Sequence, residues 1–297
     1  MSYYLGIDGG GTKTAVIVID HQQHVIKHEI FGPTSIDTID LDTFKQTFNA
    51  FFDQLNFDLD GIYAGIGGIL SQEDAMPIKN ILEKMPHVTR STHIIVNNDI
   101  MNAYFSGGFI DEGLALIIGT GSVCYGKNHE LSHRAGGWGF LEGDLGSAYD
   151  LGLNALLLSI KAFDGRIDDT PFYQHIRNSY GLMNVHDIFH SLEDIRLNRT
   201  KTASLSKLIT TEAKEGDQTA INLIIQSCEY HVQAIKAVLK KIHLNATTCV
   251  VVGSLGHDTY YFQTLQKVLL DHHLNVKLIK PILSPELAAA KYILSYK

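Results

Sequence analysis

The sequence predicts an α/β fold of two similar domains, each built on a mixed β-sheet. A length of 297 residues suggests about two domains with ample core. Apolar runs typical of buried strands alternate with runs at helical spacing. A glycine-rich hairpin near the N-terminus also recurs after residue 112, where the order of elements starts again. This duplication places the predicted domain boundary near residues 103–112.

The first half is predicted to contain three strands followed by alternating helices and strands. The expected elements are a hairpin over 3–20, a strand over 24–31, a helix after Asp40, a strand over 61–68, a helix from Ser71 and a strand over 92–97. Apolar residues at helical spacing support the helix after Asp40: Leu41, Phe44, Phe48, Phe51, Phe52 and Leu55. A three-strand meander followed by such alternation indicates a sheet of the ribonuclease-H type.

The second half repeats the hairpin and then becomes largely helical. The expected elements are strands over 113–118 and 123–126, helices between 146 and 243, a strand over 248–252, a helix over 259–271, a strand over 276–279 and a helix after Pro285. We therefore predict a first ribonuclease-H-like domain of residues 1–105, joined by the C-terminal helix 284–297. The second such domain, residues 106–283, would carry the helical insertion.

Composition indicates a soluble intracellular protein without a nucleic-acid partner. The formal charge is −8, whereas binding to nucleic acid needs a surplus of Lys and Arg. Three widely spaced cysteines form no C-x-x-C pair, so neither a disulfide framework nor an iron–sulfur or zinc-ribbon site is indicated. The first strand starts within two residues of Met1 and the apolar runs are short, so we expect no signal peptide, no membrane span and a cytoplasmic location.

The turn of the first hairpin has the composition of a phosphate-binding loop. Gly10 and Gly11 leave backbone N–H groups free to converge on an anion, and Thr12, Lys13 and Thr14 add donors and a charge. Asp8, at the end of the first strand, is placed to organise Mg²⁺ through water. Neither a Walker loop nor a dinucleotide fingerprint fits, because no helix follows the glycines. For this turn alone, a tight hairpin that binds nothing remains an equal alternative.

Two further glycine turns strengthen the phosphate interpretation. Gly119-Thr120-Gly121-Ser122 occupies the same place in the second half as the first turn does in its own half. Together the two turns can hold the β- and γ-phosphates of a nucleotide. Gly253 and Ser254, after the buried strand of 248–252, could seat the adenosine.

Two other residues are candidates for substrate contact. Asp99 follows a buried strand, at the edge where α/β sheets place ligand-binding groups; the alternative is a cap for a helix over 100–105. Trp138, the only tryptophan, lies among Gly136, Gly137 and Gly139, and its alternative is a core aromatic. The acidic Glu142-Gly143-Asp144 just beyond favours a ligand-binding loop.

The string His129-Glu130-Leu131-Ser132-His133 matches the H-E-x-x-H pattern of zinc proteases. That pattern binds zinc only on a helix, where both histidines share one face. Here it follows a strand and precedes two glycines, so a hairpin is expected and a chance match is favoured.

Taken jointly, these motifs resemble the sugar-kinase, Hsp70 and actin superfamily, and within it the N-acetylglucosamine kinase and BadF/BadG/BcrA/BcrD ATPase family. The matching stretches cover nearly the whole chain: 8–14, Asn98-Asp99, 119–122, 136–139, 143–148 and 252–254. The resemblance implies two actin-like ATPase domains flanking a central nucleotide cleft that binds MgATP. It also implies a homodimer, which is common among relatives.

The resemblance also implies roles for particular residues. Asp99 would be the catalytic base that accepts the proton of a sugar hydroxyl as the oxygen attacks the γ-phosphate. Gly137, Trp138 and Asp144 would belong to a loop that closes over the sugar. Two positions depart from the family: Leu145 stands where relatives commonly have Glu, and Ser35 where an Asn reads the N-acetyl sugar.

The function expected from the sequence is therefore phosphorylation of an amino sugar, N-acetylglucosamine or a relative such as N-acetylmuramic acid, on its 6-hydroxyl. One alternative is a dehydratase-activating ATPase of the BadF type, which needs a cluster that the cysteines here do not support. The other is a non-catalytic sugar-sensing protein, which would not need Asp99 together with both phosphate turns.

Overall fold

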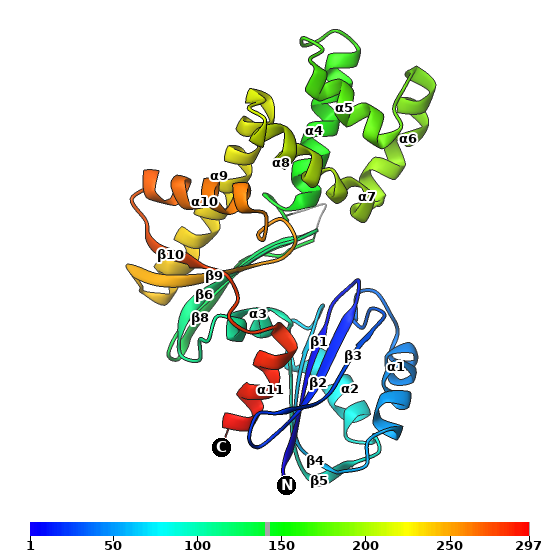
Figure 1. Ribbon diagram of the computed structural model, residues 1–297, viewed down its shortest axis with the longest axis vertical. Helices are drawn as coiled ribbons and strands as arrows, with labels where there is room; N and C mark the ends of the chain where they lie inside the picture. The colour runs from blue at the N-terminus through cyan, green and yellow to red at the C-terminus, as the bar shows by residue number, and fades with distance from the viewer. Residues whose placement is uncertain (140–142, 297) are drawn as a thin grey trace. The chain divides into compact units, whose positions relative to one another are not determined.

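The computed structural model describes residues 1–139 and 143–296. Its contacts divide the chain into two compact units. Unit 1 comprises residues 1–110 and 281–297, and unit 2 comprises residues 111–280 (Figure 1). The last segment of the chain therefore belongs to the same unit as the first strand.

Unit 1 contains a five-stranded mixed sheet with the order β3-β2-β1-β4-β5. Its strands are β1 (Tyr3–Gly9), β2 (Thr14–Asp20), β3 (Val25–Phe31), β4 (Leu59–Ile66) and β5 (Val88–Asn97). The first three form an antiparallel meander, and β4 and β5 then add parallel to β1. The meander followed by parallel strands confirms the fold class expected from the sequence.

Helices cover both faces of this sheet (Figure 1). On one face lie α1 (Leu41–Asp53) and α2 (Gln72–Leu82), and on the other α3 (Ile100–Ser106) and α11 (Pro285–Ser295). The α1 side forms an apolar core in which Phe44, Phe48, Phe51 and Phe52 are buried.

Local capping fixes where the first two helices begin. The Asp40 carboxylate accepts a 2.8 Å hydrogen bond from Thr43 N at the start of α1. Ser71 and Asp74 form a reciprocal capping box at the start of α2. Both starts are predictable from the sequence, because such caps satisfy backbone N–H groups that the first turn leaves unpaired.

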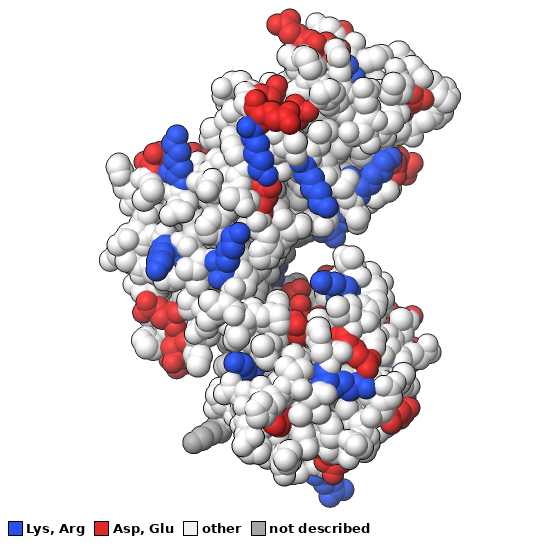
Figure 2. Space-filling view, viewed as in Figure 1, with Lys and Arg blue, Asp and Glu red and all other residues white. Residues whose placement is uncertain are grey.

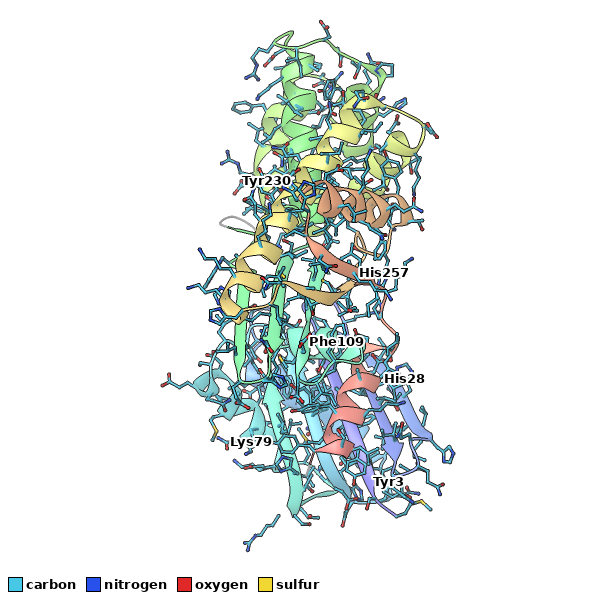
Figure 3. The ribbon with its side chains drawn as sticks, turned by 90° about the vertical axis from the view of Figure 1, so that its left-hand side faces the viewer. Tyr3, His28, Lys79, Phe109, Tyr230 and His257 are labelled. Carbon is cyan, nitrogen blue, oxygen red and sulfur yellow. The ribbon has the colours of Figure 1, made fainter. Side chains whose placement is uncertain are left out.

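Helix α11 packs directly on β1 because that strand carries a glycine at the contact. A Cβ atom at Gly6 would lie 2.0 Å from the carbonyl oxygen of Glu286, so only glycine permits this approach. His28 of β3 lies beside the same helix (Figure 3), with its Nε2 3.4 Å from Glu286 Oε1.

Unit 2 repeats the strand arrangement of unit 1. Its sheet has the order β10-β9-β6-β7-β8. The strands are β6 (Glu112–Ile118), β7 (Ser122–Asn128), β8 (Leu131–Gly136), β9 (Ala246–Val252) and β10 (Asn275–Ile279). Again three strands form an antiparallel meander, and two more add parallel to its first strand. The duplication read from the sequence is thus a duplication of topology.

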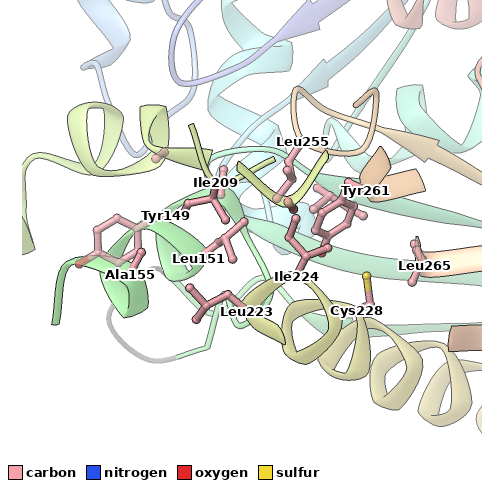
Figure 4. Packing of buried hydrophobic residues seen from close by; sticks show 14 of the residues in the cluster. Tyr149, Leu151, Ala155, Ile209, Leu223, Ile224, Cys228, Leu255, Tyr261 and Leu265 are labelled. Carbon is pink, nitrogen blue, oxygen red and sulfur yellow. The ribbon is translucent and has the colours of Figure 1, made fainter. Parts of the chain in front are cut away.

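The helices of unit 2 are α4 (Ala148–Phe163), α5 (Pro171–Tyr180), α6 (Val185–Leu197), α7 (Arg199–Ser204), α8 (Ser206–Lys214), α9 (Gln218–Ile242) and α10 (Thr259–Asp271). Helices α9 and α10 pack together through Ile224, Cys228, Tyr261 and Leu265 (Figure 4). All three cysteines are free and buried, and burial raises the pKa of the Cys124 thiol to about 12.

On the face drawn in Figure 2, Lys and Arg side chains are scattered among Asp and Glu. Of the helices in the described ranges, none is long and apolar enough to cross a membrane.

Candidate functional site

The turn between β1 and β2 presents three of its residues to solvent. Gly10 N donates to the carbonyl of Lys13 at 3.0 Å and closes the turn, while Gly11, Thr12 and Lys13 are exposed. Thr14 is buried, and its hydroxyl bonds to the Thr34 hydroxyl at 2.7 Å. Donors available to an anion at this turn therefore come from residues 11–13, whereas the Thr14 side chain supports the turn from within.

The corresponding turn of unit 2 is tied to the start of α4. Gly119 N donates to the Gly121 carbonyl at 3.0 Å, and Ala148 N donates to the Gly119 carbonyl at 2.9 Å. The Ser122 side chain is buried, and its hydroxyl donates to the Leu145 carbonyl at 2.8 Å. Thr120 and Gly121 stay partly exposed at the tip.

The third glycine turn lies beside the second. Leu255 N and Gly256 N both donate to the carbonyl of Ile118, the last residue of β6, at 3.0 and 3.1 Å. A Cβ atom at Gly253, whose φ is +94°, would lie 2.5 Å from that same carbonyl oxygen. Ser254 is exposed. Unit 2 thus brings Gly119 and Gly253 together, as the phosphate and adenosine assignments require.

In unit 1, two carboxylates lie at the carboxyl ends of β1 and β5, two strands that β4 separates in the sheet. Asp8 precedes the last residue of β1, and Asp99 follows β5. Asn102 Nδ2 donates to Asp8 Oδ1 at 2.8 Å and to the Ile7 carbonyl at 2.9 Å. Loss of hydration raises the pKa of Asp8 to about 7, and the charges of Asp99 and Glu286 add to the rise. The Asn102 hydrogen bond and the Lys13 charge act in the opposite direction.

Asp99 does not act as a helix cap. It precedes α3, but its side chain makes no capping hydrogen bond. Instead Asn98 Oδ1 accepts from Ile100 N at 3.0 Å. The bare face of Gly67 lies next to both Asp99 and Ser35: a Cβ atom there would be 3.4 Å from Asp99 Oδ2 and 2.9 Å from Ser35 Oγ. The structure therefore brings the predicted base and the predicted sugar contact Ser35 to one place.

The same place in unit 1 suits a hard divalent cation. The negative charge of Asp99 contributes to the raised pKa of Asp8, and a bound cation would relieve this repulsion between carboxylates. Asn102 Oδ1 is buried and finds no hydrogen-bond partner among the described residues. Carboxylate and amide oxygens, directly or through water, are the ligands that Mg²⁺ takes in proteins. The residues present thus fit the Mg²⁺ expected beside Asp8.

The Trp138 side chain lies exposed on its loop. Trp138 is 70% exposed, so it is not a core aromatic, and the Arg134 guanidinium lies 5.3 Å from its ring centroid. Arg134 also donates to the Gly137 carbonyl. Gly143 packs against Trp138, and the N–H groups of Gly143 and Asp144 both donate to the Gly139 carbonyl, at 2.9 and 3.1 Å. Glu142, part of the acidic stretch, lies outside the described residues.

Asp144 lies against the turn of residues 119–122 in unit 2. Its side chain is buried, and a Cβ atom at Gly121 would be 2.5 Å from Asp144 Oδ2. Arg199, the first residue of α7, places Nη2 3.8 Å from the same oxygen. Sequence reasoning missed Arg199, because nothing in its local sequence indicates that α7 returns to this loop.

The carbonyl of Gly146 is held by three side chains from distant helices. Ser227 Oγ lies 2.7 Å from it, His231 Nε2 3.0 Å and Tyr261 OH 3.3 Å. Burial lowers the pKa of His231 to about 4, so this imidazole is neutral near pH 7. Sequence reasoning missed all three, although Ser227 and His231 are four positions apart on a predicted helix and so share a face.

A small cavity lies beside the side chains that hold the Gly146 carbonyl. It has a volume of about 180 Å³ and is lined by residues that include Ser122, Gly136, Leu145, Tyr230 and His231. Tyr230 lies on α9 (Figure 3). The cavity touches both the turn of residues 119–122, through Ser122, and the two ends of the Trp138 loop, through Gly136 and Gly143.

The H-E-x-x-H string is not on a helix. His129 has a φ of +52° in the turn between β7 and β8, and His133 lies within β8. The expected hairpin is therefore correct, and the two imidazoles do not share a helical face.

Comparison with known proteins identifies relatives along the whole chain. The sequence profile of the BadF/BadG/BcrA/BcrD ATPase family matches residues 5–291. The chain is 27% identical over 290 residues to an N-acetylmuramic acid/N-acetylglucosamine kinase of Clostridium acetobutylicum, with 94% of each chain covered. It is 25% identical over 316 residues to an N-acetyl-D-glucosamine kinase of Dictyostelium discoideum, covering 99% of this chain and 98% of the other.

Solved structures share the fold. A structure from Chromobacterium violaceum, named as a candidate N-acetylglucosamine kinase, superimposes with a TM-score of 0.78 at 20% identity over 99% of both chains. A ROK family glucokinase from Streptomyces griseus, in complex with glucose and AMPPNP, gives 0.61 at 14% identity, covering 98% of this chain and 99% of that one. These likenesses confirm the actin-like ATPase architecture of two mixed sheets with helices.

Proposed function

Because the chain belongs to the BadF/BadG/BcrA/BcrD ATPase family, we propose that it is an ATP-dependent kinase that phosphorylates an N-acetylated amino sugar on its 6-hydroxyl. N-acetylglucosamine and N-acetylmuramic acid are the first candidates, since both full-length relatives are named for kinases of such sugars. The observation that carries the proposal is the position of Asp99, next to Asp8 and Ser35 and without a capping bond to α3.

Asp99 supplies the base in this proposal. A carboxylate beside the sugar accepts the proton of the 6-hydroxyl as that oxygen attacks the γ-phosphorus and the bond from phosphorus to the bridging oxygen of ADP breaks. Ser35 borders the same space and contacts the sugar. Gly137, Trp138 and Asp144 of unit 2 are proposed to contact the sugar as well, with Arg199 holding the Asp144 carboxylate in place.

The glycine turns bind the nucleotide. Backbone N–H groups of Gly11, Thr12 and Lys13 face phosphate oxygens, while Gly10 closes the turn and Thr14 braces it from inside. Thr120 and Gly121 do the same in unit 2, where Gly119 and Ser122 hold the turn in shape and Gly253 and Ser254 seat the adenosine. Asp8, with Asn102 and Asp99 close by, would hold Mg²⁺ through water, and the ion would supply positive charge to the phosphates.

The test is ADP formation with a panel of sugars: N-acetylglucosamine, N-acetylmuramic acid, N-acetylmannosamine, glucosamine and glucose. We expect an N-acetylated hexosamine to give the highest kcat/KM, and its binding to change Trp138 fluorescence because the exposed indole becomes covered. ATP hydrolysis that no sugar stimulates would support the activator alternative. Sugar binding without ADP formation would support the sensor.

Two further proposals concern assembly, from family resemblance, and location, from the sequence. We propose a homodimer, which sedimentation equilibrium of the purified protein tests. We also propose a cytoplasmic location, which fractionation of the source cells tests.

A further inference from the structure

Helix α6 carries two histidines one turn apart on its exposed side. His186 and His190 are both exposed, and their ring centroids lie 4.2 Å apart with an interplanar angle of 51°. The Phe189 ring stands edge-on to His190, at 5.6 Å and 87°, and so limits the orientations of that imidazole. Positions i and i+4 of a helix face the same way, so both rings point to one region of solvent.

In the part of the chain that the structure describes, neither imidazole has a polar partner. No hydrogen bond or ion pair joins His186 or His190 to any residue in the described ranges. Two other histidines at the surface of unit 2 do have acidic partners: His175 pairs with Glu212 at 2.7 Å, and His272 pairs with Glu229 at 2.7 Å. Asp187, between the pair, uses its carboxylate to accept from Met183 N at 3.0 Å.

We propose that His186 and His190 chelate one divalent transition-metal ion. Imidazole nitrogens bind such ions at about 2.0–2.1 Å, which places two ligating nitrogens roughly 3 Å apart on one metal. Rings with centroids 4.2 Å apart reach that separation by rotation about their side-chain torsions, without movement of the backbone. The helix thus holds both imidazoles within reach of one ion.

The donor set defines the class of metal. Neutral imidazoles suit Cu²⁺, Ni²⁺ and Zn²⁺, with Cu²⁺ bound most tightly, whereas Mg²⁺ and Ca²⁺ prefer oxygen. Within the described ranges no three His, Cys, Asp or Glu residues lie close enough to hold an ion together. The proposed site therefore has two protein ligands, and water fills the remaining positions. This makes it an exchangeable surface site, separate from the Mg²⁺ expected at Asp8 in unit 1.

Metal binding here has a structural consequence. Among the residues of α6 only Ile195, near its C-terminal end, is buried, and the turn that holds both histidines packs on the core through the partly buried Ile188. A metal that joins His186 to His190 spans that turn and stabilises its helical form. Because the ion binds the folded helix better than the unfolded chain, it should also raise the unfolding temperature of the protein.

The chain contains its own matched control. His129 and His133 have the same sequence spacing as His186 and His190, but they lie on the β7–β8 hairpin. If spacing alone sufficed, both pairs would bind metal. If the helix is required, only the pair on α6 will.

The experiment titrates Ni²⁺ and Cu²⁺ into full-length, tag-free protein by isothermal calorimetry, after EDTA treatment and its removal. We expect His190→Ala to lose about one bound ion per chain, and His129→Ala with His133→Ala to lose none. The variant His190→Ala with Ser191→His keeps the histidine count but moves the ring off the shared face, and it too should lose the site. Glu193→His, on the same face as the pair, should bind more tightly.

Thermal unfolding with and without Ni²⁺ gives the second readout, with a rise expected for the native chain and a smaller rise for His190→Ala. Unchanged stoichiometry and an unchanged thermal shift in His190→Ala would overturn the proposal. So would loss of the ion in the hairpin variant. Because the proposed kinase activity uses Mg²⁺ at another site, these outcomes do not depend on it.

Discussion

Asn102 Nδ2 donates a 2.8 Å hydrogen bond to Asp8 Oδ1 and so connects the helix that follows Asp99 to the end of β1. The same amide nitrogen reaches the Ile7 carbonyl, so one buried side chain fixes strand and helix together. Asp8 and Asp99 are therefore held in a defined relation by a residue that contributes no charge. This relation is the basis of the first two predictions.

Replacing Asn102 with Ala should weaken the response to Mg²⁺. The variant removes a donor that lowers the Asp8 pKa, so the carboxylate becomes a poorer partner for a cation. Loss of such an orienting partner typically costs about 10–100-fold in metal affinity. Mg²⁺ titration of ADP formation measures the effect. Ser106→Ala, which removes a buried hydroxyl from α3 that bonds only within its own helix, is the control.

Replacing Asp99 with Asn should abolish most of the chemistry while leaving nucleotide binding intact. The amide keeps the shape but cannot accept the proton, so phosphoryl transfer should fall by roughly two to four orders of magnitude. Single-turnover measurement isolates the chemical step, and binding of a fluorescent ATP analogue monitors the turns. A variant with near-native single-turnover rate would show that Asp99 is not the base.

Much of the fold could be predicted from the sequence because its signals are local. The caps at Asp40 and Ser71, the phenylalanine periodicity of α1 and the repeated glycine hairpin each lie within a few residues of what they determine. The equivalence of the two sheets then followed from repetition of that local pattern.

The contacts that support the site could not be predicted, because they join segments distant in the sequence. Ser227 and His231 reach the Gly146 carbonyl from a helix that begins at Gln218, and only tertiary packing brings them there. Thr14 shows that even a local motif does not determine where a side chain points. Its place in the motif indicates a phosphate contact, but the strand turns its hydroxyl toward Thr34.

Replacing Leu145 with Glu should sharpen discrimination between sugars. Leu145 is 49% exposed, so the larger polar side chain fits without disturbing the core. A site that regains a partner for a polar substituent gains roughly 1–3 kcal/mol of selectivity, which corresponds to about 5–150-fold. We expect the ratio of kcat/KM for N-acetylglucosamine to that for glucose to rise. Leu145→Met is the control, and an unchanged ratio in Leu145→Glu would place this position away from the sugar.

The neutral state of His231 should make stability depend on pH. Its native pKa is about 4, whereas an unfolded histidine has a pKa of 6.5, so the unfolded chain binds more protons between these values. The free energy of unfolding therefore falls as pH drops below 6.5, and this contribution levels off near pH 4. A shift of this size corresponds to about 3 kcal/mol at most.

The variant His231→Gln tests this, because its amide can still donate to the Gly146 carbonyl but does not titrate. Urea unfolding followed by circular dichroism at pH 7, 5 and 4 should show a smaller loss of midpoint in the variant than in the native chain. Effects of other groups, including the raised pKa of Asp8, are common to both proteins and cancel in the difference. Parallel pH profiles for the two proteins would mean that His231 is not held neutral by its burial at Gly146.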